Sequence, residues 1–189
     1  KGLCLLFNFS HYLFNNCIRG LFLGHGTRHS LYRKGKTIML SIKNLSKVYA
    51  GGKKAVDNMT IDIESGDFIA FIGTSGSGKT TALRMINRMI ESTEGEITID
   101  GKNIKELNPV ELRRSIGYVI QQIGLMPHMT VKENIVLVPK LLKWSQEKKD
   151  EKAKELIRLV DLPEEYLDRY PSELSGGQQQ RIGVVRALA

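Results

Sequence analysis

The sequence predicts an α/β domain over residues 39–189, and three observations support this fold class. Residues 40–49 and 59–65 alternate apolar and polar side chains, as half-buried strands do. A short apolar run, Phe68–Ile72, is bounded by glycines and has the character of a strand buried on both faces. This run leads through further glycines into a helical pattern that starts at Lys79, an order typical of layered α/β domains.

The other elements follow in chain order. Residues 50–58 are expected to form the turn between the first two strands. Two more strands are expected, "GEITIDG" at 95–101 and "SIGYVIQQ" at 115–122. Three helices are expected, namely Lys79–Ile90, one capped by Asn108 with Pro109 at its first position, and Ser145–Val160.

The charge distribution argues against a nucleic-acid partner. The 189-residue chain has a formal net charge of +8, but residues 1–38 hold six basic residues and no acidic one. The remaining 151 residues carry 22 basic and 20 acidic groups, so the domain itself is nearly neutral.

Residues 1–38 differ from the rest of the chain and are expected to be an extraneous or disordered leader, with Met39 as the natural start. A transit peptide is the alternative. Both cysteines, Cys4 and Cys17, lie here, which leaves the domain without a disulfide framework and fits a cytosolic location. No apolar run approaches the roughly 18–20 residues of a membrane span.

The segment "GTSGSGKTT" matches the pattern G-x-x-x-x-G-K-[ST] between the predicted buried strand and a helix. Gly73, Gly76 and Gly78 allow the loop to turn its N–H groups inward around phosphate oxygens. Lys79 reaches the β- and γ-phosphates, and the Thr80 hydroxyl ligates Mg²⁺. The predicted nucleotide-binding residues are Gly73, Thr74, Ser75, Gly76, Ser77, Gly78, Lys79, Thr80 and Thr81. The alternative is an ordinary glycine-rich turn between a strand and a helix.

A second pair of glycines lies in "ELSGGQQQR", residues 173–181. Ser175 and Gln178 fit a capping box at a helix start. Gly176 and Gly177 occupy the first turn, where each costs up to about 1 kcal/mol relative to alanine. Glycine is useful where a ligand approaches the backbone closely, and helix N-termini attract anions. The pair predicts contact with an anion, and an ordinary capping box is the alternative.

Together, the loop 73–81 and "LSGGQ" make residues 39–189 resemble the ATP-binding-cassette family. The resemblance implies a P-loop NTPase fold, with a RecA-like α/β core, an antiparallel β subdomain and a helical subdomain. It also implies a head-to-tail homodimer that hydrolyses ATP with Mg²⁺. In such a dimer Ser175, Gly176, Gly177 and Gln178 touch the ATP that the partner's P-loop holds.

The same resemblance assigns further residues. Gln121, after "GYVI", matches the Q-loop glutamine that contacts Mg²⁺ and water, and it joins Lys79 as a catalytic residue; Gln122 is the alternative. Tyr49 matches the aromatic residue that stacks on adenine, unless it only packs at the edge of a strand. His128 follows the Q-loop too closely to be the family's switch histidine, so we expect a structural or surface role.

The family's pattern continues beyond its signature helix with a strand of four apolar residues ending in Asp-Glu, which supply Mg²⁺ binding and the general base. This Walker B strand, the D-loop and the switch histidine are absent before Ala189. The segment "IRLVDLPEE" is no substitute, because Arg158 lies inside it and Leu162 follows Asp161. We therefore expect a C-terminally incomplete cassette that does not hydrolyse ATP by itself.

Three segments resemble the ATPase subunits of osmoprotectant importers, which move glycine betaine, carnitine or choline: "LRMINRMIE", "YVIQQIGLMPHMTVKENI" and "VPKLLKW". This implies permease subunits and a substrate-binding protein as partners, and a peripheral location on the cytoplasmic face of the cell membrane. A soluble ATPase of the translation-factor type and a non-functional truncated cassette are the alternatives. A chromosome-maintenance ATPase is excluded, because the 95 positions between Lys79 and Leu174 leave no room for its coiled coil.

Overall fold

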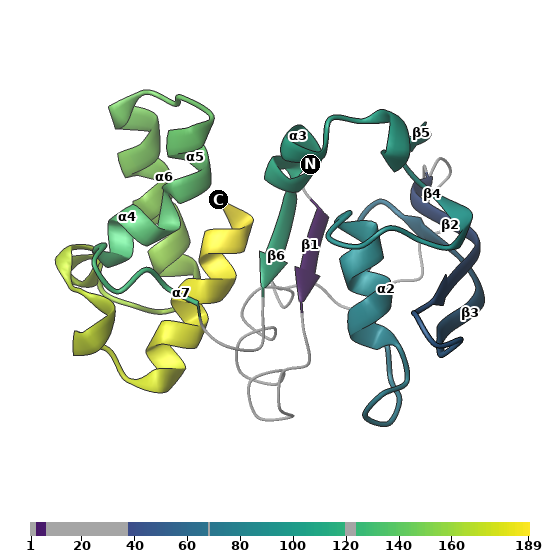
Figure 1. The fold of residues 1–189 in the computed structure, drawn as a ribbon. Coiled ribbons are helices and arrows are strands. Elements are labelled where there is room, and N and C mark those ends of the chain that lie inside the picture. Colours follow the sequence, from purple (N-terminus) through teal and green to yellow (C-terminus); the bar gives the residue numbers. More distant parts are fainter. Residues whose placement is uncertain (1–2, 7–37, 68, 120–123) are drawn as a thin grey trace, which may run out of the picture. The chain divides into compact units, whose positions relative to one another are not determined.

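The computed structural model describes residues 3–6, 38–67, 69–119 and 124–189, and these residues form helices and strands of the predicted α/β class (Figure 1). The chain divides into two compact units. Unit 2 is the continuous stretch His29–Arg114, whereas unit 1 combines Lys1–Arg28 with Ser115–Ala189. Among the described residues, no helix is both long enough and apolar enough to cross a membrane.

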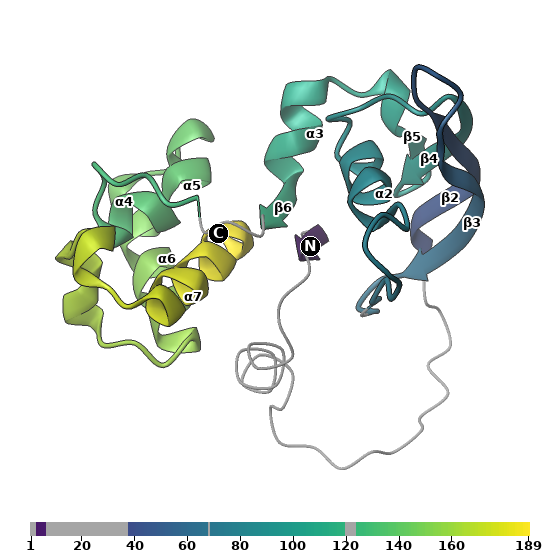
Figure 2. The same ribbon diagram turned by 60° about the horizontal axis from the view of Figure 1, so that its bottom comes forward.

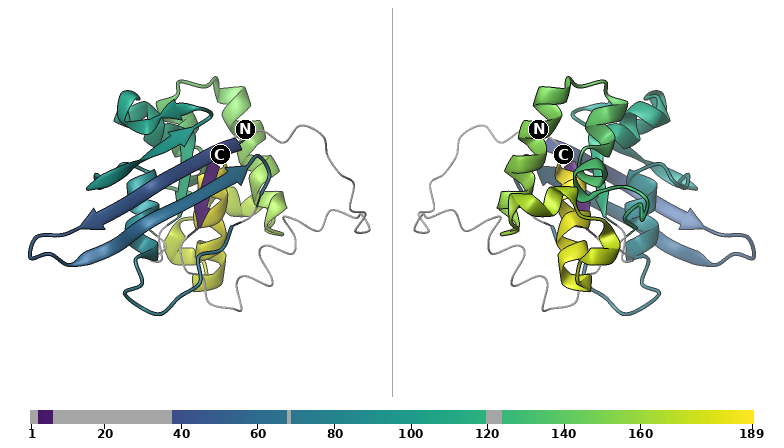
Figure 3. Two further views of the ribbon diagram at one scale, coloured as in Figure 1. Left: turned by 90° about the vertical axis from the view of Figure 1, so that its right-hand side faces the viewer. Right: turned by 90° about the vertical axis from the view of Figure 1, so that its left-hand side faces the viewer.

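Unit 2 is built on a four-stranded antiparallel sheet with the strand order β3-β2-β4-β5. Its two long strands lie side by side, as the blue ribbons of Figure 3 show. Ile42 in the middle of β2 pairs with Ile61 on one side and Ile97 on the other, and its side chain is fully buried. The strands are β2 Ile38–Val48, β3 Lys54–Glu64, β4 Glu94–Ile99 and β5 Lys102–Asn103.

The first hairpin is tighter than the sequence predicted. The expected turn over 50–58 is wrong at its C-terminal end, because β3 already begins at Lys54. Register shifts interrupt the pairing of β2 with β3, and Asn44 and Asn58 adopt positive φ angles of 50° and 47°. These irregularities break the alternating pattern that identifies a strand in sequence, so the beginning of β3 was missed.

Helix α2, Lys79–Ile86, buries Ala82, Leu83, Met85 and Ile86. It ends four residues before the predicted Ile90. Arg88 follows with a positive φ of 47°, and its guanidinium donates to the carbonyls of Ile104 and Leu107, both at 2.9 Å. The turn η1, Ile104–Glu106, and helix α3, Pro109–Ser115, complete this part of the chain.

The predicted buried strand Phe68–Ile72 is wrong for the residues that the structure describes. Residues 69–72 form neither strand nor helix, and Phe68 lies outside the described residues. Ile69 is 40% exposed and Ile72 is 95% exposed. A strand needs a neighbour for its backbone N–H and C=O groups, and no described strand pairs with residues 69–72.

Unit 1 contains a two-stranded parallel sheet of β1, Leu3–Leu6, and β6, Ile116–Val119. Leu3 pairs with Ile116 and Leu6 with Val119. These four residues of the expected leader pair with β6 through their backbone N–H and C=O groups. Residues 1–2 and 7–37 lie outside the described residues.

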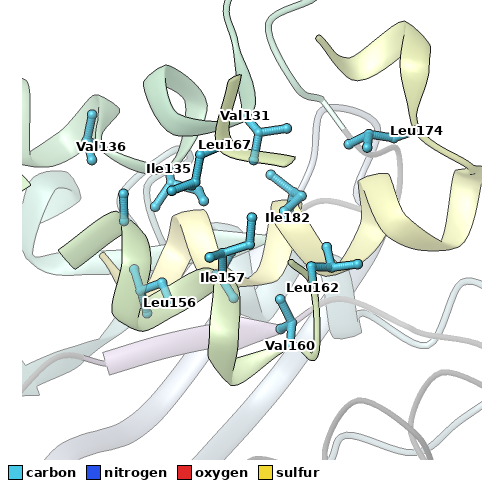
Figure 4. Packing of buried hydrophobic residues seen from close by; sticks show 12 residues of the cluster. Val131, Ile135, Val136, Leu156, Ile157, Val160, Leu162, Leu167, Leu174 and Ile182 are labelled. Atoms are coloured by element: carbon cyan, nitrogen blue, oxygen red, sulfur yellow. The ribbon is translucent and has the colours of Figure 1, made fainter. Parts of the chain in front are cut away.

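The helices of unit 1 surround one hydrophobic core, and Figure 2 shows them gathered together. The predicted helix at 145–160 is confirmed, with the Ser145 hydroxyl accepting from Lys148 N at 3.4 Å. The helices are α4 Val131–Ile135, α5 Leu137–Leu141, α6 Gln146–Leu159 and α7 Gly176–Leu188, with the short turns η2 Glu164–Asp168 and η3 Pro171–Glu173. The close-up in Figure 4 labels ten residues of the core: Val131, Ile135, Val136, Leu156, Ile157, Val160, Leu162, Leu167, Leu174 and Ile182.

Candidate functional site

The loop before α2 has a backbone that its own glycines make possible. Gly76 and Gly78 have positive φ angles of 83° and 87°, which L side chains rarely adopt. A Cβ atom on Gly78 would lie 2.2 Å from the Ala55 carbonyl oxygen in β3, and one on Gly73 would lie 2.6 Å from Ser77 Oγ. The loop therefore packs too closely on the backbone of β3 to accept a side chain at Gly78, whereas a side chain at Gly73 would first displace the Ser77 hydroxyl.

The ammonium of Lys79 lies inside this loop. It donates to the carbonyls of Gly73 and Thr74, both at 2.8 Å, and to Ser77 Oγ at 3.0 Å. Helix α2 has no side-chain cap and no acidic residue in its first turn. A cation thus sits at the uncapped, partly positive end of a helix, an arrangement that attracts anions.

The other predicted residues of this site differ in their exposure, and some lie outside the described residues. Residues 73–77 and Thr80 are exposed, so the loop and the Thr80 hydroxyl are open to a ligand. Thr81 is half-buried. Gln121 and its alternative Gln122 lie outside the described residues. Nowhere in the described part of the chain do three or more His, Cys, Asp or Glu residues gather as a metal cluster.

Tyr49 lies directly after β2, in the hairpin that leads to β3. Its backbone N–H donates to the Lys53 carbonyl at 2.9 Å, which closes the turn. The ring is 41% exposed, and the ammonium of Lys47 lies 5.4 Å from its centroid. Ala55, which Gly78 contacts, follows in the same hairpin. The stacking of Tyr49 on adenine stays a prediction.

The second glycine pair opens helix α7, and the predicted capping box is confirmed. The Ser175 hydroxyl accepts from Gln178 N at 3.4 Å, and Gln178 Oε1 accepts from Ser175 N at 2.8 Å. Gly176 and Gly177 are exposed, and a Cβ atom on either would meet no atom within 4 Å. Packing within the described part of the chain therefore gives no reason for glycine at these two positions.

Three residues that the sequence analysis did not single out hold unit 1 in shape. Asn134 is fully buried and bonds with the backbone of the preceding loop. Two arginines on α7 reach distant carbonyls: Arg181 donates to Val160 O at 2.8 Å, and Arg186 donates to Gly124 O at 2.7 Å. Sequence alone gives no signal for such contacts. His128 is exposed, as expected of a surface residue.

The sequence pattern of the family described as "ABC transporter" matches residues 56–189. This chain belongs to that family. The cassette is 71% identical over 151 residues to the carnitine transport ATP-binding protein OpuCA of Listeria monocytogenes, a match that covers 80% of this chain and 38% of the relative. It is 68% identical over 151 residues to the glycine betaine/carnitine/choline transport ATP-binding protein OpuCA of Bacillus subtilis, covering 80% and 40%. The chain thus spans about two fifths of the length of these relatives.

Solved structures support the same assignment. The cassette MJ0796, in a dimeric structure of a post-hydrolysis state bound to ADP and Pi, is 38% identical with a TM-score of 0.69, covering 79% of this chain and 69% of that one. CbiO1 from Clostridium perfringens, described as part of an ABC transporter complex, gives a TM-score of 0.72 at 24% identity, covering 80% and 61%. The latter likeness concerns the fold alone. The prediction of an ABC-type cassette fold, represented in part, is confirmed.

Proposed function

We propose that this chain is the ATP-binding part of an importer for quaternary-amine osmoprotectants such as glycine betaine, carnitine and choline. In this proposal two cassettes associate head to tail and hydrolyse ATP between them. The observation that carries the proposal is the position of the Lys79 ammonium within the glycine loop. The printed names of the relatives OpuCA and OpuBA support the class of transported substrate.

The geometry of the loop explains how it would bind the phosphates of ATP. The three contacts of Lys79 are with the neutral oxygens of two carbonyls and a hydroxyl. Phosphate oxygens carry negative charge and would replace these neutral acceptors, because charge-assisted hydrogen bonds are roughly twice as strong as neutral ones. The free N–H groups at the start of α2 would add further donors.

The Thr80 hydroxyl fits a ligand of Mg²⁺, because it is exposed in the first turn of α2, next to the residue that would hold the phosphates. A bound Mg²⁺ would neutralise charge that develops on the phosphates. Gln121 is proposed as its second contact in this chain and as the residue that orients the attacking water.

The glycine pair of α7 is proposed to contact ATP on a second copy of the cassette. Open space around Gly176 and Gly177 leaves the backbone accessible. The capping box uses the hydroxyl and amide of Ser175 and Gln178 to order the helix start without covering it. A phosphate could therefore approach the N–H groups there. The dimeric state of the similar cassette MJ0796 supports this arrangement.

Permease subunits and a substrate-binding protein are the further partners that we propose, since the relatives are named as transport proteins. The location would then be peripheral, on the cytoplasmic face of the membrane. Residues 39–189 would supply the cassette, while residues 1–38 would take no part in nucleotide binding.

Replacement of Lys79 tests nucleotide binding directly. Loss of a charge-assisted contact worth about 1.5–3 kcal/mol predicts at least a roughly tenfold weaker affinity for Mg·ATP in Lys79→Ala. Isothermal titration would measure it, and circular dichroism would show that the variant is folded. Lys102→Ala is the matched control, because Lys102 is exposed in β5. Equal affinities of the folded Lys79→Ala variant and the parent chain would refute the site.

Transport is tested with the chain extended to the length of its relatives and produced with permease and binding-protein subunits. Vesicles that contain this assembly should accumulate labelled glycine betaine when ATP is supplied on the cassette side, and Lys79→Ala should abolish accumulation. Labelled methionine is the control solute. A cassette that does not sediment with membranes containing the permease would instead favour the soluble type of ATPase.

A further inference from the structure

The last turn of α7 contacts two segments of unit 1. Strand β6 packs tightly against it, since a Cβ atom on Gly117 would lie only 2.0 Å from the Ala187 carbonyl oxygen. Arg186, the preceding residue of the helix, donates to the carbonyl of Gly124 at 2.7 Å. Two consecutive residues of α7 therefore contact β6 and the segment that begins at Gly124.

The contact of Arg186 is of a kind that is costly to break. Arg186 is half-buried, and this burial lowers the pKa of its guanidinium. No ion pair to Arg186 occurs among the residues that the structure describes. The Gly124 carbonyl is thus the acceptor for a partly desolvated cation, and charge-assisted bonds of this type are stronger than neutral ones.

The segment held by Arg186 has a shape of its own. The Asn134 side chain accepts from Met126 N at 2.8 Å and donates to the carbonyls of Met126, Met129 and Thr130 at 3.1, 3.1 and 2.9 Å. Asn134 is fully buried, and Leu125 packs against the hydrophobic core. Residues 124–130 therefore form a braced loop, and the contact at Gly124 ties the first residue of this loop to α7.

We propose that Arg186 is a positioning residue that locks the loop 124–130 to helix α7. The glycine pair, Gly176 and Gly177, begins the same helix. The loop and the glycine pair therefore move as one body. The consequence for catalysis rests on the proposed function: displacement of the loop would be transmitted along α7 to the glycines that contact the partner's ATP.

Hydrogen exchange of the full chain tests this proposal, with amides in residues 124–130 as the readout. In Arg186→Met these amides should exchange at least roughly tenfold faster, the factor that corresponds to loss of one charge-assisted bond. Amides of α6 should be unchanged. Arg186→Lys, which keeps the cation but not the guanidinium fork, should give an intermediate rate.

Arg181→Met is the matched control, because Arg181 donates from the same helix to a different carbonyl, that of Val160. It should speed exchange around Val160 and leave residues 124–130 unchanged. Equal acceleration throughout unit 1 in both variants would show a general structural role and overturn the proposal. So would unchanged exchange at 124–130 in Arg186→Met. If Arg186→Met does not fold, the exchange rates of residues 124–130 are compared between the parent chain and Arg186→Lys. Faster exchange in Arg186→Lys supports the proposal, and equal rates overturn it.

An ATP titration of the same variants separates this proposal from the proposed function. Arg186→Met should bind Mg·ATP with the affinity of the parent chain, because the P-loop lies in the other unit. Failure of every variant and of the parent chain to bind ATP would refute the proposed function, whereas the exchange result would still decide the role of Arg186. In the extended protein, Arg186→Met should lower kcat and leave KM for ATP unchanged.

Discussion

The loop before α2 and the start of α7 both place glycines at the beginning of a helix, but for different physical reasons. In the first loop, Gly78 has a positive φ of 87° and contacts the Ala55 carbonyl so closely that no side chain fits. At α7, Gly176 and Gly177 are in a regular helix, and nothing lies within 4 Å of where a Cβ atom would be. Within the described residues, the structure thus requires glycine at position 78 but gives no packing reason for the pair.

This difference indicates where each requirement comes from. The glycine at position 78 is needed for folding and would be needed without a ligand. The pair at 176 and 177 lowers helix stability without improving the packing among the described residues, which fits the proposed contact with ATP on a second cassette. The comparison supports a site that a second cassette completes.

The largest expected effect is on turnover. In the extended, dimeric protein, Gly177→Asp should reduce ATP hydrolysis by at least roughly a hundredfold. A negatively charged carboxylate would then face the phosphate to which the backbone N–H groups should donate hydrogen bonds. ATP binding to the monomer should be nearly unchanged. Steady-state hydrolysis and equilibrium titration measure the two quantities. Val110→Asp, which adds the same charge at an exposed position in the first turn of α3, should leave turnover unchanged. Loss of ATP binding rather than turnover in Gly177→Asp would contradict the comparison.

Substitution in the first loop should act on stability. Gly78→Ala should lower the free energy of unfolding by about 1–3 kcal/mol more than Gly76→Ala, since the two positions share a positive φ but only Gly78 contacts a backbone oxygen. Urea denaturation of both variants gives this difference. Equal destabilisation would mean that the contact with Ala55 is unimportant and only the backbone angle matters.

The cap of α7 should have a smaller effect. Ser175→Ala removes the acceptor for Gln178 N and should cost about 1 kcal/mol of unfolding free energy. Ser175→Asp should retain stability, because aspartate also caps helices, yet it should impair turnover in the extended dimer by repelling phosphate. Thermal unfolding and hydrolysis assays separate these outcomes. If Ser175→Asp retained full turnover, Ser175 would be only a cap.

The smallest effect is expected at Gly176. Gly176→Ala should stabilise this chain by about 0.5 kcal/mol, because alanine favours the helix and restricts the unfolded chain. Urea denaturation would detect the shift. A destabilised Gly176→Ala variant would show that the glycine has a role within the chain, and the contrast between the two helix starts would be lost.

Local chemistry made several elements predictable. Ser145 and Ser175 identify the starts of α6 and α7, and both hydroxyls accept the expected backbone bonds. The glycine pattern located the loop before α2 and its lysine. In each case the determining contacts lie within a few residues of one another in sequence, so the local pattern contains the information.

The remaining features depend on residues that are distant in sequence. Arg88 donates hydrogen bonds to the carbonyls of Ile104 and Leu107, just after the early end of α2. The spacing of apolar residues over 79–90 contains no information on these distant contacts. The apolar run around Ile72 does not form the predicted strand, because no described strand pairs with it. The contact of Arg186 with Gly124 spans 62 positions and has no local signature.

The division of the chain into units also determines an order of assembly during synthesis. Unit 2 is continuous, so it can fold as soon as it has left the ribosome, whereas unit 1 has parts on both sides of it. Strand β1 must wait for β6, about 110 positions later. Closing an unstructured loop of that length costs about 4 kcal/mol in entropy. Earlier folding of unit 2 shortens the flexible chain between the strands and lowers this cost. Pairing of β1 with β6 is therefore expected only after the intervening unit has formed.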